Sequence, residues 1–191
     1  MSDRSLHVLN LVPRGLLALG TGVVLAFRGI AMPVGNNQVP EPAKPVDLKQ
    51  YLGRWYELGR YDNSFERDCE AVTAEYSLRP DGLIRVLNTC RARSPDGPLR
   101  SAEGRAKVVV GSGNAKLKVS FFGPFFVARY WVLDHANDYS WSIVGEPSGK
   151  YLWILSRDPT PAAEVQHALV DRVRELGYDT TMIRMTHQPP D

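Results

Sequence analysis

Eight segments with the character of β-strands follow one another between Trp55 and Arg157, joined by short turns and without a helical pattern between them. Strands that follow each other without crossover segments pair antiparallel with their neighbours. A sheet of this size leaves two exposed edges unless it closes on itself. The sequence therefore predicts an all-β fold, an eight-stranded antiparallel up-and-down barrel, with strands near residues 55–65, 71–78, 83–90, 101–110, 115–122, 129–134, 139–145 and 151–157.

One helix is predicted after the strands. Thr160 can cap its start, Pro161 suits the first helical position, and Gly177 ends it. Apolar residues recur at helical spacing between these limits, namely Val165, Leu169, Val173 and Leu176. We expect this C-terminal α-helix to pack on the outside of the barrel, with an extended tail after it.

The two ends of the strand run are predicted to meet. Counting strand directions puts Gly53, Trp55 and Arg157 at the same end of an up-and-down barrel. A large indole ring can plug that end, and a planar guanidinium can stack on the ring and donate to nearby chain ends. Taken singly, each residue also fits an ordinary core or surface position. Together they predict a closed floor and an open mouth.

Residues 1–31 differ from the rest of the chain. Arg4 and Arg14 precede an apolar run that is shorter than the roughly 20 residues needed to span a bilayer, and that has the length of a signal-peptide core. Small residues suit cleavage after Ala31, while the nearby Arg28 leaves an uncleaved anchor open. We expect residues 32–45 to be a linker and residues 46–189 to be the barrel domain. No cysteine stands directly after the run, so no lipid anchored through a lipobox cysteine is expected.

Charge and motifs exclude several function classes. The net charge is +2 and the charges are scattered, which disfavours nucleic acid as a partner. The sequence lacks the Gly-x-Ser-x-Gly, His-Glu-x-x-His and phosphate-loop patterns, so we predict no enzyme and no cofactor. It also lacks a Cys-x-x-Cys or Cys/His grouping, so no metal site is expected.

Two cysteines, Cys69 and Cys90, fall near the predicted rim on neighbouring strands. In an exported chain such a pair favours a disulfide, with two separate buried thiols as the alternative. Simple alternation, however, puts Cys69 on the opposite face from Val72. A bulge or an irregular strand start before Ala71 would remove this conflict.

An apolar ligand needs a dry, preformed lining, and an eight-stranded barrel can just hold one small ligand. Small residues at 102, 104 and 106 leave room inside. Alternation alone does not name the inner face, so some inward candidates could instead face the helix. The predicted lining consists of Tyr76, Val86, Ala106, Val119, Phe121, Val132, Trp141 and Trp153.

The loop that contains Phe122, Phe125 and Phe126 is placed at the rim by the strand count. Exposed aromatic side chains mark a ligand entrance, a peripheral membrane contact or a protein interface. We expect an entrance plus a contact, with Phe125 at the mouth. The alternative is a loop folded down as a lid. A phosphate or carboxylate head group could meet an arginine near the mouth, the candidates being Arg60, Arg67, Arg91 and Arg129.

Three signatures in order resemble the lipocalin family. They are Gly53-Arg54-Trp55-Tyr56, the run from Tyr130 to Tyr139, and Tyr151-Leu152-Trp153-Ile154-Leu155-Ser156-Arg157. Phe65-Glu66-Arg67 and the run from Ala115 to Phe125 are similar to the bacterial outer-membrane subgroup and its relatives, apolipoprotein D and the plant temperature-induced lipocalins.

The resemblance implies binding and transport or storage of small apolar ligands, in this subgroup fatty acids or lysophospholipids. We therefore expect an exported carrier in the periplasm or cell envelope, with association with the outer membrane as the narrower option. The alternative is a protein-interaction or self-association module, such as a homodimer, that uses the phenylalanine-rich loop while the cavity is incidental. An enzyme acting on a buried apolar substrate is a third reading.

Overall fold

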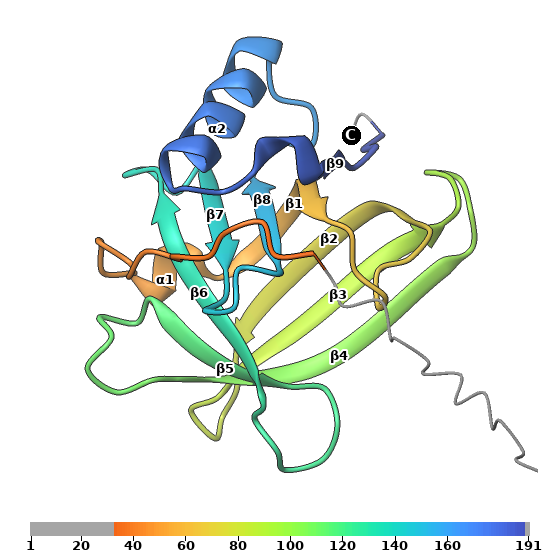
Figure 1. Cartoon of the computed structure of the whole chain (residues 1–191). Helices are drawn as coiled ribbons and strands as arrows, with labels where there is room; N and C mark the ends of the chain where they lie inside the picture. The colour runs from red at the N-terminus through yellow and green to blue at the C-terminus, as the bar shows by residue number, and fades with distance from the viewer. Residues whose placement is uncertain (1–32, 190–191) are drawn as a thin grey trace, which may run out of the picture. The chain divides into compact units, whose positions relative to one another are not determined.

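The computed structural model describes residues 33–189, so the signal or anchor predicted for residues 1–31 lies outside the described residues. Each strand pairs antiparallel with the next, β8 returns to β1, and β1 also pairs β2, which closes the barrel (Figure 1). The predicted antiparallel barrel is confirmed. Its strands are β1 (Gly53–Tyr61), β2 (Cys69–Leu78), β3 (Ile84–Ala92), β4 (Leu99–Val108), β5 (Lys116–Ser120), β6 (Ala128–His135), β7 (Trp141–Gly145) and β8 (Leu152–Ser156).

Strand β1 carries three partners. β8 pairs with it along one edge, from Tyr56 to Arg60. On the other edge, β2 pairs with residues 53–56, and the short β9 (Ile183–Met185) pairs with residues 59–61. The C-terminal strand thus occupies the edge that β2 leaves. A 3₁₀ turn, η1 (Thr180–Met182), leads into β9.

A bulge in β2 places the cysteines. The β2–β3 register shifts between Glu70 and Thr73, and Ala71 has a φ of 47°. The shift brings Cys69, Val72 and Cys90 into one buried cluster, and the two cysteines form a disulfide with their Cα atoms 5.5 Å apart. Both the predicted disulfide and the predicted bulge are confirmed.

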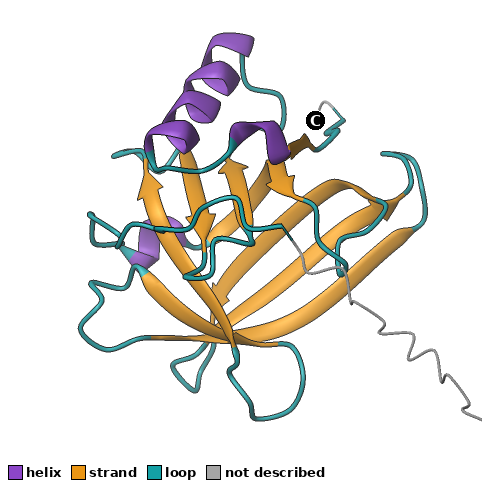
Figure 2. Ribbon diagram, in the orientation of Figure 1, coloured by secondary structure: helices purple, strands orange, loops and turns teal. Residues whose placement is uncertain are grey.

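The long helix α2 (Ala163–Glu175) covers the outside of the barrel, as predicted (Figure 2). Its Leu169 and Val173 pack with outward-facing residues of β7 and β8, such as Ile143 and Ile154, in a cluster separate from the barrel interior. The helix begins after the predicted Thr160, whose N–H donates to Asp158 instead, in a turn that precedes it. Within residues 33–189 no helix is both long and apolar enough to span a membrane.

The segment expected as a linker is held against the barrel over its described part, residues 33–45. The Gly35 N–H donates to the Gly149 carbonyl at 3.0 Å, and the Asp179 N–H donates to the Gly35 carbonyl at 2.9 Å. The Asn36 amide donates to the carbonyl of Leu176 at the end of α2. In Figure 1 this orange segment crosses the barrel wall. The segment has few apolar residues and no periodic pattern, so backbone and amide hydrogen bonds to the barrel could not be predicted from its sequence.

We predict that replacing both Cys69 and Cys90 by serine lowers the free energy of unfolding by about 3 kcal/mol, because the bond joins residues 21 positions apart and restricts the unfolded chain. Urea unfolding measures the loss. Reducing the parent protein should cost the same, and reducing the double variant should change nothing. Equal urea midpoints for parent and variant would contradict the prediction.

Candidate functional site

The floor of the barrel is closed by an indole and a guanidinium. Trp55 is fully buried, and its Nε1–H donates to the Tyr51 carbonyl at 2.8 Å. The guanidinium carbon of Arg157 lies 3.8 Å from the centre of the Trp55 ring. Arg157 also donates to the carbonyls of Gln50 and Leu52, both at 2.8 Å. It thereby fixes the short helix α1 (Leu48–Tyr51) across the end of the barrel.

Gly53 makes this closure possible. It joins α1 to β1 with a φ of 92°, in the left-handed region where a side chain is strained. A Cβ atom there would also lie 3.4 Å from Arg157 Nη1. The structure thus places the three predicted floor residues, Gly53, Trp55 and Arg157, side by side at the same end of the barrel.

A cluster of phenol groups lies above the floor. The hydroxyl of Tyr130 is 2.8 Å from that of Tyr51 and 3.0 Å from that of Tyr76. Tyr51 also reaches Ser142 Oγ at 3.1 Å. Burial raises the pKa of Tyr51 to about 12 and raises the pKa values of Tyr76 and Tyr130 as well. These phenols are therefore uncharged and satisfy one another at the deep end of the barrel.

Above these tyrosines the barrel is hollow. About 130 Å³ can be reached by the centre of a water molecule, and the total empty space, including the part open to solvent, is about 790 Å³. The wall is mostly apolar. Six of the predicted lining residues lie in it, namely Tyr76, Val86, Ala106, Val119, Phe121 and Trp153. Residues absent from the prediction include Glu57, Phe65, Glu66, Val72, Ala74, Asn88, Leu117, Ala128, Tyr130 and Leu155.

Two predicted lining residues lie elsewhere. Val132 packs in the same interior cluster as much of the cavity wall, but it does not itself border the cavity. Trp141 faces outward and borders a separate groove with Leu169 and Arg172 of α2. The prediction for Trp141 failed because β7 has apolar residues on both faces, Val144 toward the barrel interior and Ile143 toward the helix.

The phenylalanine loop is exposed and does not act as a lid. Phe125 is 72% exposed and lies outside the cavity wall, unlike its prediction as a mouth residue. Phe122 shares a shallow pocket with Arg79 of the β2–β3 turn, although the strand count puts that turn at the floor. The two meet because β5 pairs only with Arg105–Val108 at the end of β4, so tilted strands bring the loops together.

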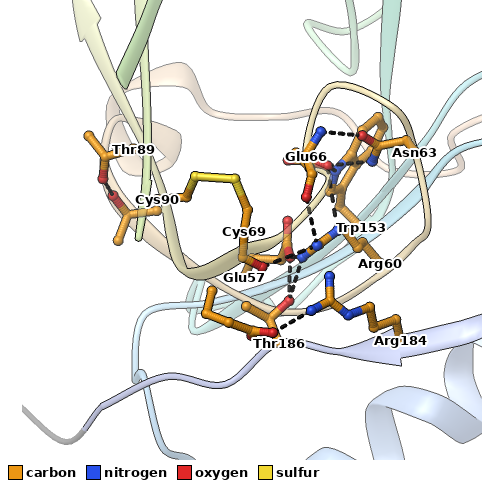
Figure 3. The surroundings of a disulfide bond; sticks show 12 residues. Glu57, Arg60, Asn63, Glu66, Cys69, Thr89, Cys90, Trp153, Arg184 and Thr186 are labelled. Atoms are coloured by element: carbon orange, nitrogen blue, oxygen red, sulfur yellow. Dashed lines mark hydrogen bonds and ion pairs between the residues drawn. A yellow bond between two sulfur atoms is a disulfide. The ribbon is translucent and has the colours of Figure 1, made fainter. Parts of the chain in front are cut away.

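A buried ion pair lies beside the cavity, on the side of the C-terminal tail (Figure 3). Arg60 Nη1 is 2.5 Å from Glu57 Oε1 and donates to Thr186 Oγ1 at 3.0 Å, and both charged side chains are buried. The other nitrogen, Nη2, donates to the carbonyls of Glu66 and Cys69. Arg60 is therefore committed to the protein, and it does not offer the head-group contact that the sequence suggested.

Burial shifts the ionisation of Glu57. Loss of water, followed by repulsion from Glu66, raises the pKa of Glu57 to about 7, although Arg60 opposes the shift. Glu66 accepts a hydrogen bond from Trp153 Nε1 at 3.0 Å. Both residues border the cavity, so its wall carries acidic groups beside the apolar lining.

Of the four arginines predicted near the mouth, Arg129 alone borders the cavity. Arg67 is exposed away from it, and Arg91 donates to the Gly97 carbonyl in the β3–β4 loop. The acidic pair was missed because Glu57 on β1 and Glu66 in the loop after it show no pattern that distinguishes them from surface charges.

A barrel with a sealed floor, an apolar hollow and an open side defines a binding protein for small apolar molecules. The family model described as "Lipocalin-like domain" matches residues 46–188. The chain is 46% identical over 156 residues to "Outer membrane lipoprotein Blc" of Vibrio cholerae serotype O1, covering 78% of this chain and 89% of that protein. It is 37% identical over 161 residues to "Temperature-induced lipocalin-1" of Arabidopsis thaliana, covering 79% of this chain and 86% of that protein. The chain belongs to the lipocalin family.

A solved structure supports the fold. Insecticyanin from the tobacco hornworm Manduca sexta superposes with a TM-score of 0.63 at 22% identity, over 82% of this chain and 88% of that one. The Vibrio relative is named a lipoprotein, which runs against our expectation that lipid anchoring is absent, and we do not carry that expectation further. Both cysteines of the printed sequence belong to the disulfide.

We predict that Arg157→Lys lowers the free energy of unfolding by about 2 kcal/mol. Lysine keeps the charge, but it lacks the planar group that stacks on Trp55 while donating to several carbonyls of α1. Thermal and urea unfolding measure the effect. Arg174→Lys, on the exposed face of α2, is the matched control and should behave as the parent. Equal losses for the two variants would contradict a special role for the stacked guanidinium.

We predict that Glu57→Gln flattens the dependence of stability on pH. The folded protein holds a proton on Glu57 up to about pH 7, whereas the ordinary pKa is 4.5. The resulting stabilisation is complete below pH 4.5 and is lost as the pH rises through about 7. The loss is at most about 3 kcal/mol.

Urea unfolding over this pH range, compared between parent and variant, isolates the contribution of Glu57. Glu175→Gln on the surface of α2 serves as the control and should keep the slope of the parent. Parallel curves for the parent and the Glu57 variant would show that the buried carboxyl does not titrate in this range.

Proposed function

We propose that the barrel binds one acyl chain of a fatty acid or a lysophospholipid and carries or stores it in the bacterial cell envelope. The observation that supports this most is the preformed apolar cavity above a sealed floor. The name of the Vibrio relative, an outer membrane lipoprotein, supports the envelope as the place of action.

The energetics favour an acyl tail. Each buried methylene contributes roughly 0.8 kcal/mol before ordering costs are subtracted, so a tail of about ten methylenes suffices for useful affinity. A preformed wall lowers the ordering cost because the protein has little to rearrange. We propose binding rather than catalysis, since several polar groups of the cavity are engaged in structural hydrogen bonds, such as those of Trp153 with Glu66 and of Tyr76 with Tyr130.

The sealed floor sets the direction of entry. A tail that points toward Tyr76 and Tyr130 leaves its head group toward the open end, where Phe65 and Glu66 of the β1–β2 loop border the cavity. Asn88 also borders the cavity, and its side-chain oxygen is buried without a hydrogen-bond partner. That oxygen suits a hydroxyl donor, which the glycerol of a lysophospholipid has and an ionised fatty acid lacks. This contact supports the lysophospholipid over the fatty acid.

A second candidate is self-association or protein binding through the phenylalanine loop. The exposure of Phe125 favours some contact at this surface. Sedimentation of the purified chain and of Phe125→Ser tests it. A dimer that is lost in the variant, together with an interior free of lipid on extraction, would favour this candidate over the carrier.

We predict that Ala106→Trp weakens binding of a fluorescent fatty acid or lysophospholipid at least tenfold, because the indole fills space that the fully buried Ala106 leaves open. Ser101→Trp is the control, since Ser101 is an exposed residue of the same strand. Circular dichroism checks that both variants keep the barrel. Unchanged binding in a folded Ala106→Trp protein would refute the cavity as the binding site.

A further inference from the structure

Three cations lie in a row on the outer face of the barrel. In the sheet register Lys107 of β4 is opposite Lys118 of β5, which is opposite Arg129 of β6. All three are exposed, and among residues 33–189 none of them forms an ion pair with a carboxylate. Like charges directly opposite on neighbouring strands destabilise a sheet. The row is therefore a local cost to the stability of the sheet.

An apolar loop borders this row. In the segment between β5 and β6, Phe122 is 88% exposed, Phe125 is 72% exposed and Val127 is 81% exposed. Exposed apolar groups gathered in one loop mark a contact surface. We call this loop and the three cations the basic–aromatic surface.

Contacts hold the loop beside the cations. Lys107 Nζ lies 4.7 Å from the centre of the Phe126 ring, and Arg105 Nη2 donates to the Gly123 carbonyl at 2.8 Å. Phe126 is thus folded back onto β4, while its neighbours project outward. The apolar tips and the positive charges consequently occupy one side of the molecule.

We propose that the basic–aromatic surface docks on an anionic lipid bilayer. Apolar side chains that enter the head-group region, flanked by lysine and arginine that attract anionic lipids, are the combination that interfacial membrane contacts use. The unpaired cation row supplies the charge complementarity that selects this occupant. A symmetric dimer through the same surface would bring two copies of the row together, and their repulsion opposes it.

Membrane docking goes beyond the proposed ligand binding, because it would place the opening of the cavity next to a lipid bilayer. The exposed apolar side chains lie between Phe121 and Arg129 in the sequence, and these two residues both border the cavity. The bilayer would therefore contact the molecule next to the opening, and an acyl chain could pass between membrane and cavity over a short path.

The test uses the full chain and extruded vesicles of phosphatidylcholine, with or without phosphatidylglycerol, in low and high salt. We expect binding to vesicles that contain phosphatidylglycerol, weakened by salt. Each neutralised cation should weaken binding about fivefold. The double variant Lys107→Gln/Lys118→Gln tests the cation row. The control is the double variant Lys49→Gln/Arg67→Gln, which removes two exposed cations outside the surface and should have little effect.

The apolar part has its own matched pair. Phe122→Ser with Phe125→Ser should lose binding, whereas Leu99→Ser with Val110→Ser removes exposed apolar side chains elsewhere and should not. Ala106→Trp separates docking from cavity binding, since it should still bind vesicles. Binding that ignores phosphatidylglycerol, or that falls equally in test and control variants, would overturn the proposal. Sedimentation showing a dimer that Phe125→Ser abolishes would assign the surface to self-association instead.

Discussion

The stacking of Arg157 on Trp55 is the interaction on which the rest of this structure depends. A guanidinium from the end of β8 covers an indole from the start of β1 and holds the carbonyls of α1 at the same time. One end of the barrel is thereby sealed without filling the interior. Because the seal uses residues at the two ends of the strand run, it also ties the last strand of the barrel to the first. Because this stacked pair closes the end of the barrel, the space above it does not have to be filled with core side chains and can remain as a cavity.

The opposite part of β1 is organised by charge. Glu57 and Arg60 are buried together, and the hydroxyl of Thr186 in the C-terminal tail completes their hydrogen bonds. Pairing a buried carboxylate and guanidinium is costly unless the remaining hydrogen bonds are made, and here the tail makes them. The tail is therefore a structural part of the barrel wall next to the cavity. Burial and the nearby Glu66 raise the pKa of Glu57 to about 7, while Arg60 and the Thr186 hydroxyl oppose this shift.

Much of this arrangement could be predicted from the sequence. Period-two alternation located the strands, and the strand count brought Trp55 and Arg157 together. The inner face could not be predicted everywhere, because α2 makes the outer faces of β7 and β8 as apolar as the inner ones, which misplaced Trp141. The Glu57–Arg60 pair and the hold on residues 33–45 were missed since both depend on partners far away in the chain. The position of Phe122 beside Arg79 depends on how far β5 extends along β4, which residue types do not encode.

The sharing of β1 among three partners has a consequence for how precisely the barrel must assemble. A slip of one position in β1 would misalign its ladders with β2, β8 and β9 together, and it would turn Trp55 outward. Errors at this strand cannot be absorbed locally, whereas a slip in the β3–β4 hairpin disturbs fewer contacts. Assembly should therefore be all-or-none around β1, with few long-lived forms in which the barrel is closed but its strands are wrongly aligned.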